Sequence, residues 1–190
     1  HLKIQNLRIN APTMSGVVLT DNAQNITLHN NQIFADTTGT SSLVCGIVST
    51  GSLTSTATYG NNANNITITN NVVKGGYYGI VVNGASTSGK ISDWTITGND
   101  VSLQYYYNIR IYYAEDLTIN DNYCHDTRST GGYGLMVYYS NDFEIVGNNL
   151  PAKSYGLYLY HWVVFQAYRK LAGNALNLQE FLALMAITVV

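Results

Sequence analysis

The chain has 190 residues, a net charge of −2 and charged side chains at only 11% of its positions. This length suits one domain with at most a small appendage. The charge balance excludes the basic patch that nucleic-acid binding requires, and no apolar run reaches the roughly 20 residues of a membrane span. Two cysteines are too few for a disulfide scaffold. The 16 tyrosines and 17 glycines, with abundant asparagine and threonine, favour many short strands joined by turns.

A short pattern recurs six times along the chain. Each repeat opens with two apolar residues separated by one residue, which is the period of a strand with one buried face. The repeats open at Leu2, Ile26, Ile66, Trp94, Leu117 and Phe143. An asparagine follows this strand in five repeats, at Asn31, Asn71, Asn99, Asn122 and Asn148, while the first repeat has Leu7. Asparagine tolerates the left-handed conformation and its amide can bond to the same residue one repeat away, so we expect a stacked ladder here.

Two further strands are predicted in each repeat. Two residues beyond the asparagine position, an apolar residue is expected to line the core: Ile9, Ile33, Val73, Val101, Cys124 and Leu150. A variable loop then leads to a strand that opens with Gly16, Gly46, Gly79, Asn108, Gly134 and Gly156. The preference for glycine predicts a positive φ at this opening position. Three short strands per repeat predict an all-β fold, a right-handed parallel β-helix of about six coils over residues 1–162.

Residues 163–190 break the repeat pattern. The segment from Tyr168 onward is rich in alanine and leucine, which favours a helix, at least from Leu176 to Met185. An open solenoid end exposes unpaired backbone and core, so the segment is expected to cap the last coil or to form an interface, including one between two copies of the chain. The closing Ala-Ile-Thr-Val-Val is equally compatible with a strand.

The repeats resemble the parallel β-helix repeat superfamily, which includes pectate-lyase-like enzymes, mannuronan C5-epimerases, phage tailspikes and periplasmic accessory proteins. The text from Leu117 to Asp126, LTINDNYCHD, and that from Gly131 to Val137, GGYGLMV, are most similar to the epimerase and periplasmic accessory repeats. This resemblance specifies the fold rather than an activity. The chain contains no Asp-Pro-His, Asn-Thr-Asp, Gly-His-Gly or Arg-x-Pro-x-x-Arg motif, which are catalytic signatures in those enzyme families.

The outward positions of the glycine-led strands are rich in tyrosine. If the coils stack in register, Tyr112, Tyr138 and Tyr160 form one row, and Tyr113, Tyr139 and His161 form a second. A third row contains Tyr78, Tyr107, Tyr133 and Tyr155. The resemblance implies that this strand lines the substrate groove, and tyrosine rings suit sugar rings. We therefore expect substrate-binding residues at Tyr112, Tyr138, Tyr158, Tyr160 and His161. Aromatic stacking that only stabilises the sheet is the alternative explanation.

Charged side chains lie beside this predicted groove. His125, Asp126 and Arg128 occupy one loop, and Arg110 lies in the preceding coil. Such a set could abstract a C5 proton and neutralise the carboxylate of a uronic acid, so these four residues are the candidate catalytic group. No cofactor or metal site is expected, because Asp100, Asp121 and Asp126 are too scattered to predict a calcium site.

Two functions remain open at this point. The first is a secreted or cell-surface protein that binds an acidic polysaccharide and acts on it as a lyase or epimerase. The second is a non-catalytic module, such as an adhesin or tailspike-like segment, that binds glycan or serves as a stalk. The expected partner in both cases is a polysaccharide. The missing catalytic motifs favour the second function, and the cluster of arginine, histidine and tyrosine favours the first.

Overall fold

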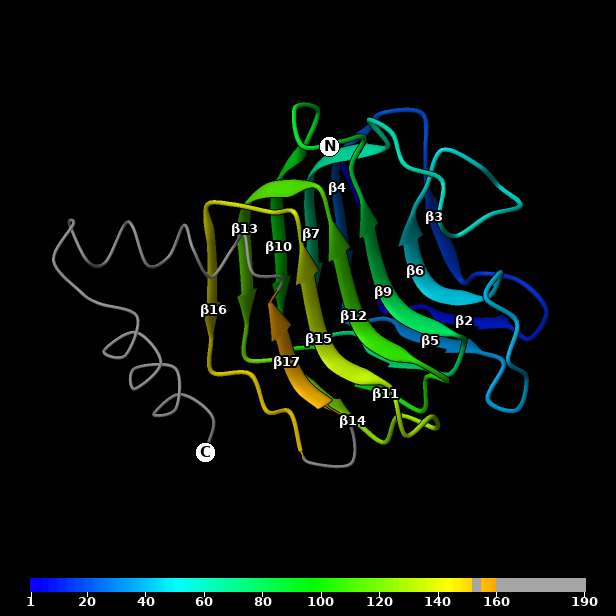
Figure 1. Cartoon of the computed structure of the whole chain (residues 1–190). Helices are drawn as coiled ribbons and strands as arrows, with labels where there is room; N and C mark the ends of the chain where they lie inside the picture. The colour runs from blue at the N-terminus through cyan, green and yellow to red at the C-terminus, as the bar shows by residue number, and fades with distance from the viewer. Residues whose placement is uncertain (152–154, 160–190) are drawn as a thin grey trace, which may run out of the picture.

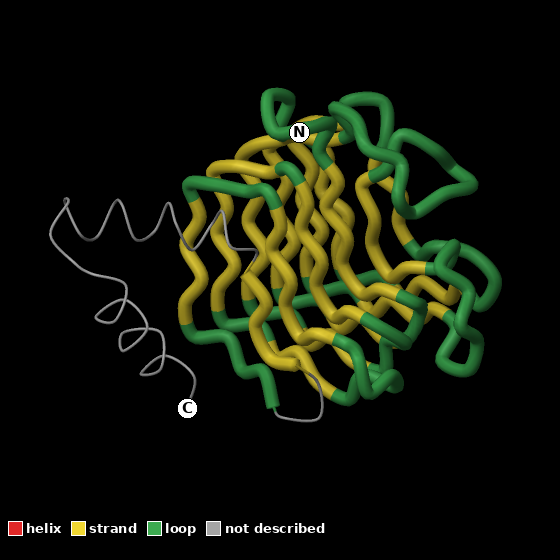
Figure 2. Tube along the Cα trace, in the orientation of Figure 1, coloured by secondary structure: helices red, strands yellow, loops and turns green. Residues whose placement is uncertain are grey.

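The computed structural model describes residues 1–151 and 155–159, and these form a parallel β-solenoid (Figure 1). Every strand pairing is parallel, and each strand pairs with its counterpart in the next coil. The described residues contain strands, turns and loops but no helix (Figure 2). Accordingly, no helix long and apolar enough to cross a membrane occurs in the described part of the chain.

The strands form three sheets that run along the solenoid. The first sheet contains β1 (Leu2–Gln5), β4 (Ala23–His29), β7 (Ala63–Thr69), β10 (Ile91–Thr97), β13 (Ala114–Asn120) and β16 (Phe143–Val146). The second contains β2 (Arg8–Ala11), β5 (Gln32–Ala35), β8 (Val72–Lys74), β11 (Asp100–Ser102) and β14 (Tyr123–His125). The third contains β3 (Val17–Leu19), β6 (Cys45–Ser49), β9 (Tyr78–Asn83), β12 (Tyr107–Tyr112), β15 (Tyr133–Tyr138) and β17 (Tyr155–Leu159).

The predicted coil register is confirmed. The six repeat openings align in one row, since Leu2 pairs with Ile26 and the alignment continues through Ile66, Trp94 and Leu117 to Phe143. Five coils have all three strands, and the sixth contributes β16 and β17 among the described residues. The predicted C-terminal helix and interface at 163–190 lie outside the described residues.

The core fills the space between the three sheets. The inward residues of the first strand, such as Ile66, Ile68 and Ile96, are fully buried, as are Ile33 and Val101 from the second sheet. Alternate side chains point to the other face of each sheet because the side-chain period of a strand is two. The core is therefore a continuous apolar column along the solenoid axis.

The asparagine ladder is confirmed along its whole predicted length. The Nδ2 of Asn71 donates to Oδ1 of Asn99 at 3.1 Å, and Nδ2 of Asn99 donates to Oδ1 of Asn122 at 2.9 Å. Each amide also bonds to backbone, because Asn99 donates to the carbonyl of Ile68 and its Oδ1 accepts the backbone N–H of Asn71. These buried amides thus join three coils at once.

The left-handed backbone lies one residue before the ladder, so this detail of the prediction is wrong. The five residues that directly precede the ladder asparagines all have φ between 52° and 68°: Asn30, Asn70, Gly98, Asp121 and Gly147. The ladder asparagines are selected by the hydrogen bonds of their buried amides, whereas the corner residue before them takes the strained conformation.

The explanation of the glycine-led strands is also wrong. None of the described glycines at this opening position has a positive φ. Close packing instead requires the glycines of the first three coils, since a Cβ on Gly79 would lie 2.4 Å from the carbonyl oxygen of Asn108 and 2.5 Å from Cγ1 of Val101. Asn108 is accommodated in its coil because its amide donates to the carbonyls of Val101 and His125.

Both cysteines are buried and free. They lie in the second and fifth coils, and a separation of three coils is too large for a disulfide bond. Cys45 lies on the outer face of the third sheet, with Val48 and Val81, while Cys124 belongs to the central core.

We predict that Asn99→Asp destabilises the solenoid by about 1–3 kcal/mol, because the carboxylate can donate neither to the carbonyl of Ile68 nor to Oδ1 of Asn122, which then keeps the backbone N–H of Asn99 as its donor. Urea denaturation measures the change. Asn61→Asp, at an exposed loop position, is the control and should stay within about 0.5 kcal/mol of the wild type. Equal stabilities for the two variants would show that the ladder does not hold the coils together.

We predict that Gly79→Ala destabilises the protein by about 1–3 kcal/mol through the steric overlap with Asn108 and Val101. The matched control is Gly131→Ala, where the nearest atom would lie at 3.6 Å, an ordinary contact. Thermal unfolding of both variants tests this. A Gly79→Ala protein as stable as the control would contradict the packing explanation.

Candidate functional site

The outer face of the third sheet carries three rows of side chains along the solenoid axis. The first row runs through Cys45, Tyr78, Tyr107 and Tyr133. The central row runs through Val18, Val48, Val81, Arg110 and Met136. The last row contains Asn83, Tyr112 and Tyr138. The register predicted for the tyrosine rows is therefore confirmed up to these residues.

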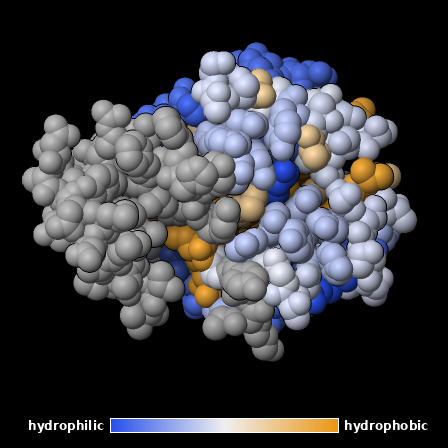
Figure 3. All heavy atoms as spheres, viewed as in Figure 1, coloured by the Kyte–Doolittle hydropathy of each residue, from blue (hydrophilic) through white to orange (hydrophobic). Residues whose placement is uncertain are grey.

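The tyrosine rings contact one another from coil to coil. The rings of Tyr78 and Tyr107 stack with centroids 5.5 Å apart, and Tyr107 contacts Tyr133 at 5.4 Å. Across the face, Tyr112 contacts Tyr138 at 4.8 Å. All of these side chains are half-buried, so each ring keeps part of its surface accessible. Figure 3 shows this face, where pale, weakly hydrophilic atoms cover most of the described area.

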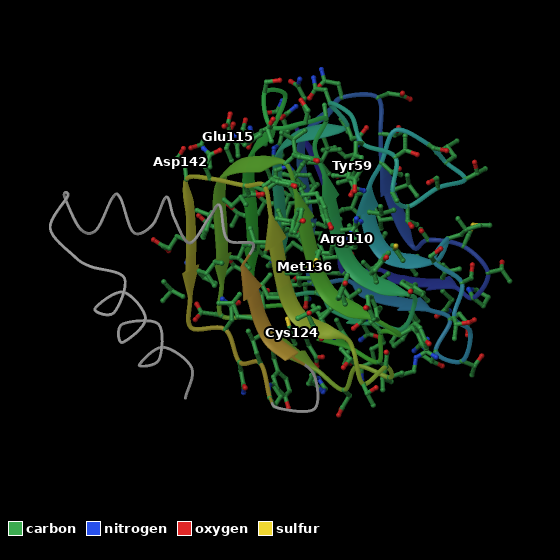
Figure 4. The ribbon with its side chains drawn as sticks, in the orientation of Figure 1. Tyr59, Arg110, Glu115, Cys124, Met136 and Asp142 are labelled. Atoms are coloured by element: carbon green, nitrogen blue, oxygen red, sulfur yellow. The ribbon has the colours of Figure 1, made fainter. Side chains whose placement is uncertain are left out.

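The central row forms the floor between the tyrosine rows. Arg110 is only 6% exposed and Met136 only 4%, although both side chains point away from the central core. Both side chains are therefore covered by their neighbours on this face and not open to solvent. Figure 4 shows Arg110 and Met136 on the side of the third sheet that faces the viewer.

Arg110 lies between aromatic rings. Its guanidinium carbon lies 4.2 Å from the ring centroid of Tyr112 and 5.2 Å from that of Tyr78, which are cation–π distances. Its nitrogens donate to Oδ1 of Asn83 at 3.3 Å and to the hydroxyl of Tyr59 at 3.4 Å. Every one of these partners is uncharged.

Tyr59 is a site residue that the sequence analysis missed. It lies in the loop between β6 and β7, where no coil periodicity marks it. Its ring contacts those of Tyr112 and Tyr113, with centroids 5.7 and 5.4 Å away. The loop is fixed to the face by Thr56, whose hydroxyl donates to the carbonyl of Ser42 and whose carbonyl accepts from Asn83.

Burial changes the acidity of this face. Desolvation raises the pKa of the Tyr78 hydroxyl to about 12, although the nearby Arg110 charge opposes the shift. Desolvation likewise raises the pKa of the Cys45 thiol to about 12. The pKa values of Tyr107 and Tyr112 are also raised, chiefly by desolvation. These groups are therefore neutral near pH 7, and the tyrosines serve as neutral aromatic surfaces with hydroxyl rims.

The other predicted catalytic residues have different surroundings. His125 bonds through Nδ1 to Asp126 at 2.8 Å and through Nε2 to Asp100 at 3.1 Å, and its ring stacks on Tyr123. Both ring nitrogens thus face carboxylates. Arg128 donates to the carbonyls of Leu103 and Gly39. The structure brings His125 and Asp126 together, but the partners of Arg110 and Arg128 are other residues.

The remaining substrate-binding candidates lie at the C-terminal end of the face. The backbone of Tyr158 pairs with that of Met136. Tyr160 and His161 lie outside the described residues. No group of three or more histidine, cysteine, aspartate or glutamate side chains that could hold a metal ion occurs within residues 1–151 and 155–159.

We predict that the unfolding free energy falls as the pH rises from about 10 to about 12. In this range the unfolded chain releases the Tyr78 proton, whereas the native protein retains it, so ionisation favours the unfolded state. Urea unfolding at several pH values measures the loss. Tyr78→Phe should flatten the curve in this range because phenylalanine cannot ionise. An unchanged slope in Tyr78→Phe would show that this tyrosine is not the group responsible.

Comparison with known proteins identifies a matching protein family. A family model described as periplasmic copper-binding protein (NosD) matches residues 37–181, which is well over half of the chain. No curated protein and no solved structure matches the chain. The periplasmic description agrees with the expected secreted or cell-surface location, and the solenoid agrees with a β-helix family. The chain belongs to the NosD family of periplasmic proteins.

Proposed function

We propose that this chain is a glycan-binding solenoid that holds a polysaccharide along the outer face of the third sheet. The observation that carries the proposal is the row of half-buried tyrosines in consecutive coils, with Tyr78, Tyr107 and Tyr133 on one side and Tyr112 and Tyr138 on the other. Tyrosine offers a flat apolar face and a polar hydroxyl, which together suit a sugar ring.

Repetition along the axis supports a polymer as the ligand. Stacked coils repeat every 4.8 Å or so, which is about the length that one sugar unit adds to an extended chain. A polysaccharide lying along the solenoid would therefore meet a tyrosine in each of the third, fourth and fifth coils. A single small ligand would use only one or two of these rings.

The geometry favours binding over catalysis. An acid–base mechanism requires its groups within reach of one reacting atom. His125 is engaged with Asp100 and Asp126, and Arg110 is engaged with Tyr59 and Asn83. Lyase or epimerase activity is the alternative function. It rests on the His125–Asp126 pair.

The described residues do not fit a copper site, although the family name contains that metal. Copper is bound by histidine, thiolate and thioether ligands grouped around it. Burial raises the pKa of both Cys45 and Cys124, and the two lie three coils apart. His29 bonds to Thr69, and both nitrogens of His125 bond to carboxylates. We therefore propose no copper chemistry for residues 1–151 and 155–159.

We predict that Tyr138→Ala weakens glycan binding about tenfold, because one stacking ring is removed. Glycan-array screening identifies the ligand, and calorimetry with that ligand measures the affinity. Tyr123→Ala is the matched control, because this exposed tyrosine lies on the second sheet. The Tyr123→Ala variant should bind the glycan with wild-type affinity.

Three results would count against the proposal or redirect it. An array without any bound glycan would contradict it, as would equal loss of affinity in both variants. Release of an unsaturated uronate product from uronate polymers, abolished by His125→Ala, would favour the lyase function instead. Binding without turnover, and with His125→Ala unchanged, is the result that we expect from a binding module.

A further inference from the structure

We infer that Arg110 is an anion-recognition site in the floor of the tyrosine face, which takes the carboxylate or sulfate group of an acidic sugar unit. The inference rests on the proposed glycan-binding function and adds the chemical class of the ligand. It is carried by three observations: the unbalanced charge of Arg110, the two tyrosine walls beside it, and the position of Tyr59 above it.

The charge of Arg110 has no acidic partner among the described residues. The ion pairs there join Lys90 to Glu115 and His125 to two aspartates, and none involves Arg110. In Figure 4 the labelled acids Glu115 and Asp142 lie at a different part of the molecule from Arg110. A buried charge without a counter-ion is costly, and a single anionic group placed beside it would remove that cost.

The present partners of Arg110 leave capacity for an anion. Its hydrogen bonds to Asn83 and Tyr59 are long, at 3.3 and 3.4 Å, and both acceptors are neutral. Bonds from arginine to a carboxylate are shorter and about twice as strong, and the planar guanidinium can form two in parallel. A carboxylate or sulfate would therefore be a better partner than either existing acceptor.

The two tyrosine walls fix how such a ligand would lie. Tyr112 and Tyr78 stand on opposite sides of Arg110, at cation–π distance from its guanidinium. A sugar ring resting against the tyrosines would direct an acidic substituent toward the floor. The hydroxyl groups of the tyrosines remain protonated near pH 7, so they can donate hydrogen bonds to the anion.

Tyr59 controls access to Arg110. Its hydroxyl occupies an acceptor position on the guanidinium, and its side chain is 42% exposed. The backbone beside it is held by hydrogen bonds from Gly51 to Thr58 and from Gly60 to Gly84. A rotation of the Tyr59 side chain would free this acceptor position on the guanidinium while the loop stays in place, and exposed side chains change rotamer within nanoseconds.

The experiment compares oligogalacturonate with its methyl ester, which has the same rings without the charge. We expect the wild type to bind the acid form at least tenfold more tightly than the ester at low salt, with the preference decreasing at high salt. Arg110→Met should lose the preference and bind the acid form and the ester with similar affinity. Arg8→Met is the control variant. Arg8 lies in the first coil, with its guanidinium carbon 4.7 Å from the centroid of the Phe34 ring, so this variant should keep the full preference for the acid form.

The outcomes separate the two proposals. Equal binding of acid and ester by the wild type would overturn the role of Arg110 and leave glycan binding standing. If neither oligosaccharide binds, sulfate is titrated against chloride at equal ionic strength. If sulfate raises the melting temperature of the wild type but not that of Arg110→Met, the result would still support the anion site. Equal responses of the two proteins to sulfate would overturn it.

A second variant covers the case in which Arg110→Met does not fold. Arg110→Lys keeps the positive charge but loses the two parallel donors, so it should retain a preference for the acid form that is several-fold smaller than that of the wild type. If neither Arg110→Lys nor Tyr59→Ala changes the preference for the acid form, the charge of the ligand is recognised elsewhere and the inference is overturned.

Discussion

Stacking of the coils in strict register is the constraint on which the whole molecule depends. Each coil leaves its backbone donors and acceptors pointing along the axis, and only a neighbouring coil can pair them. The asparagine ladder fixes this register from inside, because each buried amide bonds to side chains and carbonyls in the coils beside it. A shift of one residue would leave these amides unpaired and turn the apolar side chains of every strand outward.

The same register creates the candidate site. A residue type that recurs at one position of the repeat becomes a continuous row on the solenoid, as the tyrosines at positions 78, 107 and 133 do. Aromatic stacking within a row stabilises the sheet, and the accessible parts of the rings form a continuous surface along the axis. Arg110 is the exception, because its burial among neutral groups costs stability that ring contacts only partly offset.

Two errors of the sequence analysis have a common physical cause. Glycine at position 79 and asparagine at position 99 were both assigned to left-handed backbone, since this is the usual local reason for those residues. The structure requires them for contacts between coils instead, with a steric limit at Gly79 and a buried amide at Asn99. Local conformational preference cannot distinguish these reasons, because the neighbours concerned are 20 to 40 residues away in the sequence.

The sequence by itself determined the coil boundaries, the inward and outward positions, the asparagine ladder and the tyrosine rows, because all of these follow from a repeated local period. Only the tertiary structure decided what covers the rows and which charged groups meet. Tyr59 reaches Arg110 across 51 positions, and Arg128 reaches Gly39 across 89. His125 meets Asp100 from the preceding coil. These contacts come from loops of unequal length and from side chains of neighbouring coils, where no period relates one residue to another, so their partners are set by the packed fold alone.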